Sequence, residues 1–402
     1  MDSSVVTAPA GERLRELVAA LAVTTTVGYG VLIYAFSALL GPMSHDLAVS
    51  TTTVVGASTT AVLVSGLISI PVGRRLDVRG GRGLMATGSV LAAFAVLGWS
   101  RVENTFQLYA VFVLIGVASA MVLYPPAMAV VVSVAAPAKR TNSILTITLV
   151  GGLASSIFIP LTGYLALALG WRTALAVLAG ILAATTIPLH LLAVPPRQTP
   201  KLTSTRSPKS PTRVLKDPGF WFLAGAFVVH SAALAAISVH LVLYLITLGH
   251  PPARAASLAG LLGLLSVTGR LVTSVSARWL PMATITSLIL TVQGIAIALL
   301  PVLGRQVAGA IGCLVLFGLG FGVSSIATPA ILLDRYGATG FGTIAGMLGT
   351  PTTIAKATGP LAGAGLAEAF GYRPLVLSVA VACVVAAAGL ALTRKVRPVA
   401  TM

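Results

Sequence analysis

The chain has 402 residues, of which 56% are hydrophobic and only 9% are charged. Soluble domains carry about 25% charged residues, so this composition excludes an ordinary water-soluble protein and indicates a chain solvated by a lipid bilayer. A net charge of +17 by itself would be compatible with nucleic-acid binding, but the distribution of the basic residues points elsewhere.

Long apolar runs recur along the chain, and each can cross about 30 Å of hydrocarbon as a helix. The runs are continuous rather than alternating, which favours helices over a transmembrane barrel. The first run is too long for a signal-peptide core, and we expect a retained helix that ends at Gly41-Pro42. We predict an all-α membrane protein with twelve spans, at residues 14–40, 51–73, 83–100, 105–135, 141–169, 173–194, 218–248, 254–278, 282–303, 306–333, 340–367 and 374–393.

Basic residues fall unequally on the two sides of these predicted spans. One side holds 19 lysines and arginines, and the other holds only Arg101, Arg172, Arg254, Arg305 and Arg373. The positive-inside rule then predicts a multi-pass protein of the cell membrane with both termini in the cytoplasm. The positive charge is therefore mainly a topology signal, and no soluble basic domain is left to bind nucleic acid.

The longest polar stretch, at residues 195–217, is rich in Pro, Ser, Thr and basic residues. It predicts a cytoplasmic linker between a six-helix half at 1–194 and a second at 218–402. The halves also repeat at a spacing of about 200 residues, which indicates a duplicated unit with the substrate site between its copies. The matching positions are Pro160, Gly163 and Gly170-Trp171-Arg172 against Pro360, Gly363 and Gly371-Tyr372-Arg373, and Gly116 and Pro126 against Gly318 and Pro329. We expect Pro160 and Pro360 to bend their helices.

The loop expected between the second and third spans, at 73–83, reads GRRLDVRGGRG. Together with the twelve spans and the duplicated halves, it resembles the major facilitator superfamily, whose loop reads G-x-x-x-D-R-x-G-R-R. The chain departs from that pattern at Val78, and the basic residue comes one position later. The resemblance implies that Asp77, with Arg74, Arg79 and Arg82, forms a gating latch to the other half that breaks when the carrier changes state. The alternative is that Asp77 only neutralises local positive charge.

Two cations, Arg270 and Lys356, lie near the middle of predicted spans that contain no acidic residue at similar depth. Arg270 is eight residues, or about 12 Å, from the cytoplasmic end of its helix. Charge at this depth is costly, so we expect both side chains to face the interior and to bind an anionic substrate. The guanidinium suits a carboxylate, and the ammonium adds a point charge. The alternatives are an arginine tied to helix carbonyls and a lysine that burial keeps neutral.

An arginine in the eighth helix and a lysine in the eleventh resemble the oxalate–formate antiporters, in which they bind a dicarboxylate. The related monocarboxylate transporters have an Asp one turn before the arginine, where this chain has Ser266, and a lysine in the first helix, which this chain lacks. The bacterial members of the group, which the chain resembles more closely, have an aromatic, His-lined pocket. Candidates for it here are Tyr29, Tyr34, Tyr124, His240 and Tyr244. Each tyrosine can equally be a packed ring, and His240 either carries a proton or stays neutral. We expect His230 to be structural.

We therefore predict a secondary transporter of small organic mono- or dicarboxylates that works by alternating access, through anion exchange or linked to a proton. Proton linkage would use His240 or a neutral Lys356, because no carboxylate lies mid-span. The expected partners are the anion, a proton or counter-anion, and the lipid, with the carrier acting as a monomer. No enzyme, metal or cofactor site is indicated, and Cys313 and Cys383 are expected in the core. Proton-coupled efflux of a drug-like compound, and a non-transporting receptor or scaffold, remain alternatives.

Overall fold

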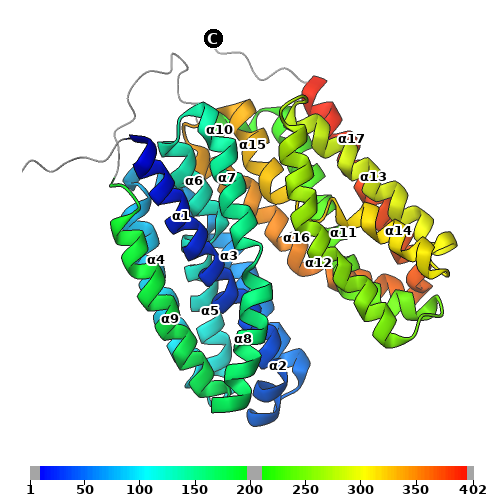
Figure 1. Cartoon of the computed structure of the whole chain (residues 1–402), viewed down its shortest axis with the longest axis horizontal. Helices are drawn as coiled ribbons and strands as arrows, with labels where there is room; N and C mark the ends of the chain where they lie inside the picture. Colours follow the sequence, from blue (N-terminus) through cyan, green and yellow to red (C-terminus); the bar gives the residue numbers. More distant parts are fainter. Residues whose placement is uncertain (1–9, 197–210, 396–402) are drawn as a thin grey trace, which may run out of the picture. The chain divides into compact units, whose positions relative to one another are not determined.

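The computed structural model describes residues 10–196 and 211–395, and these ranges fold into helices without a strand (Figure 1). The chain divides into two compact units, Met1–Thr205 and Arg206–Met402. Most of the predicted linker at 195–217 lies outside the described residues. Its last part forms a short helix, α10 (Pro211–Leu215), where the sequence predicts only a flexible tether.

Ten helical segments in the described part of the chain are long and apolar enough to cross a membrane. The two other predicted spans, 306–333 and 340–367, correspond to the interrupted pair α14–α15 and to the long helix α16. The twelve-helix prediction is therefore consistent with the structure.

The first unit consists of nine α-helices and one π-helical turn among its described residues. They are α1 (Ala10–Tyr29), η1 (Gly30–Tyr34), α2 (Ala35–Asp46), α3 (Thr51–Arg79), α4 (Gly81–Trp99), α5 (Thr105–Val122), α6 (Tyr124–Val134), α7 (Pro137–Gly151), α8 (Ala154–Leu169) and α9 (Trp171–Leu192). The expectation that Gly41-Pro42 ends the first helix is wrong, because α2 continues through Pro42 to Asp46. Leu39 and Met43, on either side of the proline, are fully buried and keep this segment packed.

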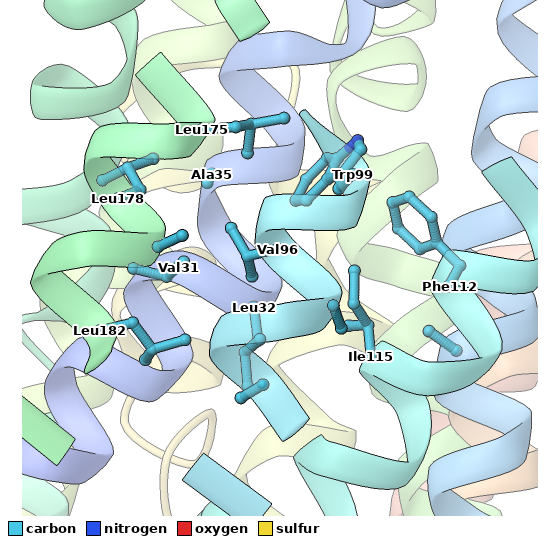
Figure 2. Close-up of a cluster of buried hydrophobic side chains, with 14 of the residues drawn as sticks. Val31, Leu32, Ala35, Val96, Trp99, Phe112, Ile115, Leu175, Leu178 and Leu182 are labelled. Carbon is cyan, nitrogen blue, oxygen red and sulfur yellow. The ribbon is translucent and has the colours of Figure 1, made fainter. Parts of the chain in front are cut away.

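The core of the first unit forms where α2, α4, α5 and α9 meet (Figure 2). Trp99 and Phe112 pack edge to face with ring centroids 4.9 Å apart. The indole nitrogen of Trp99 donates to the sulfur of Met43 at 3.0 Å, which satisfies its one polar group. Leu178 and Leu182 of α9 are fully or almost fully buried in the same cluster. This apolar packing leaves little room for charge inside the first unit.

The second unit repeats the arrangement. Its helices after α10 are α11 (Pro218–Thr247), α12 (Pro252–Ser276), α13 (Met282–Leu303), α14 (Val307–Gly318), α15 (Ser324–Tyr336), α16 (Phe341–Phe370) and α17 (Tyr372–Lys395). Its core includes Ile237, Leu300 and Phe317, and the thiols of Cys313 and Cys383 are free and buried in it. The prediction that these two cysteines are small core residues is confirmed.

The sequence repeat coincides with equivalent local geometry. Gly170 and Gly371 each end one helix and begin the next with positive φ, +79° and +85°, and each donates its N–H to the residue four positions earlier. Glycine adopts this backbone conformation without steric cost. Gly116 of α5 packs against α3, and its counterpart Gly318 of α14 packs against α12. Pro160 and Pro360 both lie inside helices, α8 and α16.

Candidate transport site

A break in the predicted span at 306–333 creates the central feature of the second unit. α14 ends at Gly318 and α15 begins at Ser324. Between them the backbone forms tighter, three-residue hydrogen bonds, from Phe321 N–H to the Gly318 carbonyl at 3.0 Å and from Gly320 N–H to the Phe317 carbonyl at 3.2 Å. The sequence predicts this segment as one continuous span, although its three alternating glycines are the signal for the break.

Arg270 of α12 lies against this break. A Cβ atom at Gly322 would be only 2.5 Å from the backbone carbonyl oxygen of Ser266 and 2.6 Å from Nε of Arg270. Gly269, the neighbour of Arg270, packs directly on the carbonyl of Leu319. Arg270 itself is half-buried. Glycine at position 322 therefore leaves the space that the guanidinium occupies, and part of the arginine stays accessible.

A buried polar network connects three further helices to the same break. His230 of α11 shares a hydrogen bond of 3.0 Å with Oε1 of Gln293, from α13, and one of 3.2 Å with the hydroxyl of Ser324, at the start of α15. The amide nitrogen of Gln293 donates to the carbonyl of Phe317 at 2.8 Å. His230 and Gln293 are completely buried. The sequence predicts a structural role for His230, which agrees with this burial, and Gln293 is a functional candidate that no motif marks, although a glutamine inside an apolar span is itself a signal.

Lys356 lies on α16 at the level of His230. The two helices approach closely along a glycine seam, where Gly359 packs on the backbone of Ala232 and Gly363 contacts Ala236. Lys356 precedes Gly359 by three residues, and His230 precedes Ala232 by two. The two side chains therefore begin at about the same depth along the paired helices, which we call the same layer. The lysine side chain is exposed.

His240 and Tyr244 lie further along α11. His240 is ten residues, or about 15 Å, beyond His230. Its Nε2 hydrogen-bonds to the carbonyl of Pro360 at 3.1 Å, and its ring lies 6.0 Å from that of Tyr372. Nδ1 of His240 and the hydroxyl of Tyr244 are buried and have no hydrogen-bond partner in the described part of the chain. The structure thus places these two residues one turn apart, in a different layer from Arg270 and Lys356.

The three tyrosine candidates of the first unit gather around its helix interruptions. Tyr29 ends α1 where η1 begins, and its ring centroid is 4.6 Å from that of Tyr124, the first residue of α6. The hydroxyl of Tyr124 donates to the carbonyl of Thr148 at 3.3 Å and lies against Gly151. Tyr34 closes η1 and, like the other two, is half-buried. Tyr29 and Tyr124 thus form a neutral aromatic pair.

The predicted gating loop is mostly helical in the structure. α3 continues to Arg79, so Arg74 and Asp77 belong to its last two turns, and only Gly80 separates it from α4. Arg74 and Arg79 are exposed and Asp77 is half-buried. Nε of Arg82 donates to the carbonyl of Val194 at 2.7 Å, which ties the start of α4 to the end of α9. Arg82 therefore holds two helices of its own unit together.

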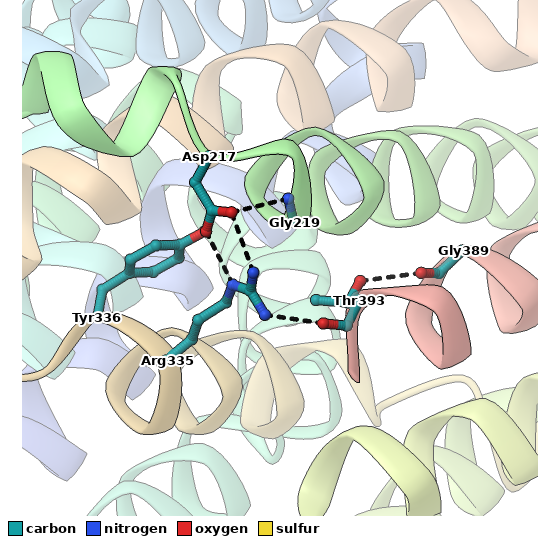
Figure 3. Close-up of polar contacts among 6 residues, drawn as sticks. All are labelled: Asp217, Gly219, Arg335, Tyr336, Gly389 and Thr393. Atoms are coloured by element: carbon teal, nitrogen blue, oxygen red, sulfur yellow. Dashed lines mark hydrogen bonds and ion pairs between the residues drawn. The ribbon is translucent and has the colours of Figure 1, made fainter. Parts of the chain in front are cut away.

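A buried ion pair joins three helix ends of the second unit (Figure 3). Asp217 begins α11 and accepts hydrogen bonds from Arg335 at 3.0 Å, from the hydroxyl of Tyr336 at 2.8 Å and from Gly219 N–H at 3.0 Å. Arg335 also donates to the carbonyl of Thr393, near the end of α17. Burial alone would raise the pKa of Asp217, but these hydrogen bonds and the Arg335 charge outweigh it and hold that pKa below its usual value.

From the sequence alone, Arg335 is only one of the basic residues that indicate topology. Asp217 directly before Pro218 is a recognisable helix start, yet its partners lie more than 100 residues away and cannot be read from spacing.

Two related helical units with interrupted helices in each define a membrane carrier. The family described as "Major Facilitator Superfamily" matches residues 20–351, so the chain belongs to this superfamily. It is a membrane transporter and not an enzyme. The comparison with curated proteins gave no significant match.

Solved structures with the same fold share little sequence with the chain. The human organic anion transporter MFSD10 aligns with a TM-score of 0.72 at 15% identity and covers 96% of this chain and 100% of its own. The E. coli fucose:proton symporter FucP gives 0.72 at 14% identity, covering 94% and 98%. The proton:xylose symporter XylE gives 0.71 at 11% identity, covering 94% and 95%. At these identities the likeness concerns the fold.

Proposed function

We propose that this carrier transports small organic anions, with mono- or dicarboxylates as the substrate class and Arg270 and Lys356 as the charged contacts. One observation carries the proposal: the second unit holds these two cations inside long helices, six or more residues from either end, while its carboxylates, Asp217, Asp334 and Glu368, lie at or near helix ends. An anion that enters the carrier would supply the missing negative charge. The finer resemblance to the oxalate–formate and monocarboxylate groups is part of this proposal.

In the proposed mechanism, Arg270 binds one carboxylate through its planar guanidinium from its position against Gly322. Lys356 on α16 meets a second carboxylate or the remaining charge of a single one. Tyr29, Tyr34 and Tyr124 offer hydroxyls and aromatic surface from the first unit. His240 and Tyr244 belong to a further layer, where their buried polar atoms gain partners when the carrier changes state. Asp77, with Arg74, Arg79 and Arg82, remains the proposed gate.

The proposed carrier acts as a monomer in the cell membrane with both termini in the cytoplasm, as the distribution of basic residues favours. Neutralising both cations with substrate makes the occluded state less costly, so exchange of one anion for another, or co-transport of a proton, is favoured over movement of the empty site. Among the proteins of the same fold, MFSD10 is described as an organic anion transporter, and FucP and XylE as proton symporters.

Thermal stabilisation of the purified protein tests the substrate class. Acetate, lactate, oxalate, malonate and succinate are compared with amines and drug-like cations, because a ligand that binds the native state raises the melting temperature. We expect carboxylates to stabilise the protein. Arg270→Gln should weaken their binding at least about hundredfold, since each hydrogen bond to a charged group contributes about 1.5–3 kcal/mol. Arg278→Gln, at an exposed arginine just after α12, is the matched control. Stabilisation by amines instead would indicate drug efflux.

Lys356→Gln tests the second contact separately. We expect binding of malonate and succinate to fall by about tenfold or more, because one charged contact is lost, while acetate and lactate change less. An equal loss for both classes would mean that Lys356 does not bind the second carboxylate.

A further inference from the structure

The hydrogen bonds around His230 fix which of its nitrogens carries a hydrogen. The carbonyl of Phe317 can only accept, so the amide nitrogen of Gln293 must face it, at 2.8 Å. Oε1 of Gln293 is left facing His230 at 3.0 Å, and this oxygen also only accepts. Nε2 of His230 therefore carries the hydrogen, and in the neutral ring Nδ1 accepts from the hydroxyl of Ser324.

The same surroundings can hold the charged ring without losing a hydrogen bond. If a proton binds at Nδ1, the Ser324 hydroxyl turns and accepts from it, while Nε2 continues to donate to Gln293. Every N–H of the imidazolium is then satisfied, which removes much of the cost of a buried charge. Ser324 is half-buried, whereas His230 and Gln293 are fully buried, so a proton reaches Nδ1 from the side of Ser324.

One cationic side chain lies on the helix that packs along α11. Lys356 of α16 starts at the same depth of the α11–α16 seam as His230. Among the other groups on helices packed around α11, Arg270 of α12 lies against Gly322 at the break, and Cys313 and Cys383 are neutral buried thiols. Like charges at close range disfavour each other, so His230 should gain its proton most readily once an anion has neutralised Lys356.

We propose that His230 is the proton-binding site of this carrier, and that Lys356 couples it to the anion site so that one proton is taken up with each anion. The inference rests on the proposed function, since it needs an anion at Lys356. It explains how proton coupling can operate without a mid-span carboxylate. The proton moves from water to Nδ1, and the Ser324 hydroxyl changes from donor to acceptor.

Calorimetry on the purified full chain measures the proton directly. Malonate, or the carboxylate of the panel that binds most tightly, is titrated near neutral pH in MOPS and in Tris, whose ionisation enthalpies differ. The difference in observed heat gives the protons taken up per anion bound, and we expect about one. Affinity should then rise about tenfold for each unit by which the pH falls, over the range where uptake is complete.

Variants assign the proton to His230. His230→Gln should still bind malonate but take up no proton, and its affinity should be flat with pH. His190→Gln is the matched control, because His190 is also fully buried and bonds to a serine hydroxyl, Ser89 at 2.7 Å, in the first unit. It should behave as the wild type. Ser324→Ala, a milder change, should move the pH dependence to lower pH, since the charged ring loses its partner at Nδ1.

The outcomes separate the two proposals. Malonate binding without proton uptake in the wild type would overturn the role of His230 and leave the anion carrier standing. Uptake that persists in His230→Gln would place the proton elsewhere, also against the inference. If no carboxylate of the panel binds at all, the proposed function fails, and the coupling fails with it.

Discussion

The two halves of this transporter both contain interrupted helices, but different kinds of side chain lie at the interruptions. In the first unit, the interruption between α5 and α6 presents Tyr124, which packs on Tyr29. In the second, α14 ends at the matched glycine itself, Gly318, and the interruption that follows borders Arg270. The break in the first unit, at Leu123, comes seven residues after Gly116. Duplication therefore accounts for the frame, and the later divergence of side chains gave one half aromatic rings and the other half cations.

The ion pairs of the two units differ in the same way. Asp46 and Arg172 of the first unit pair at 2.9 Å with side chains 47% and 39% exposed. Asp217 and Arg335 of the second pair at 3.0 Å with side chains only 4% and 9% exposed. Solvent screens the first pair and not the second, so the two should differ in their contribution to stability even though their distances are alike.

The largest expected effect is the loss of stability when the buried ion pair is broken, compared with the exposed one. Asp217→Asn keeps a good helix cap for Gly219 but leaves Arg335 buried without its counter-charge, which should cost about 3–5 kcal/mol. Asp46→Asn is the matched change in the first unit and should cost about 1 kcal/mol or less. Melting temperatures in the same detergent compare the two. Equal losses would show that burial does not distinguish the halves.

The stability from Asp217 should also depend on pH. Its pKa is lower in the folded protein than in the unfolded chain, so its contribution is present above the unfolded value of about 4 and is lost as the pH falls through the native value. We expect wild type and Asp217→Asn to differ most near neutral pH and to converge in acid. A constant difference down to the most acidic pH at which the protein stays folded would mean that the carboxylate charge is not the source of the stability.

The sequence was sufficient to predict the membrane-spanning helices and their duplication. It was much less informative about the polar contacts between those helices. Continuous apolar runs predict the spans, and the repeated Gly-Trp-Arg and Gly-Tyr-Arg motifs mark real helix junctions with positive φ. Hydropathy does not place the breaks, because a short turn inside an apolar run leaves it unchanged, and only the alternating glycines at 318, 320 and 322 mark the break in the second unit. The contacts of His230 with Gln293 and of Asp217 with Arg335 join residues 63 and 118 positions apart, which periodicity cannot pair.

A smaller effect is expected where glycine makes room for the charge. Gly322→Ala places a methyl group 2.5 Å from the backbone carbonyl oxygen of Ser266 and 2.6 Å from Nε of Arg270, so α12 must shift and carry the guanidinium with it. If that costs one charged hydrogen bond to the substrate, carboxylate affinity should fall about tenfold to a hundredfold. Gly312→Ala, on α14, is the control because a Cβ there has no neighbour within 4 Å. Unchanged affinity in Gly322→Ala would separate anion binding from the position of Arg270 at the break.

The smallest effect should come from the aromatic half. Tyr124→Phe removes a long hydrogen bond, 3.3 Å to the carbonyl of Thr148, and keeps the ring that packs on Tyr29. The loss should be about 0.5 kcal/mol in stability and no more than about threefold in carboxylate affinity. Tyr164→Phe, at a tyrosine that is 70% exposed in the same unit, is the control and should change neither. A tenfold loss of carboxylate affinity in Tyr124→Phe would match the effect expected for Gly322→Ala. The hydroxyls of the first half would then contribute as much to anion binding as the charges of the second half.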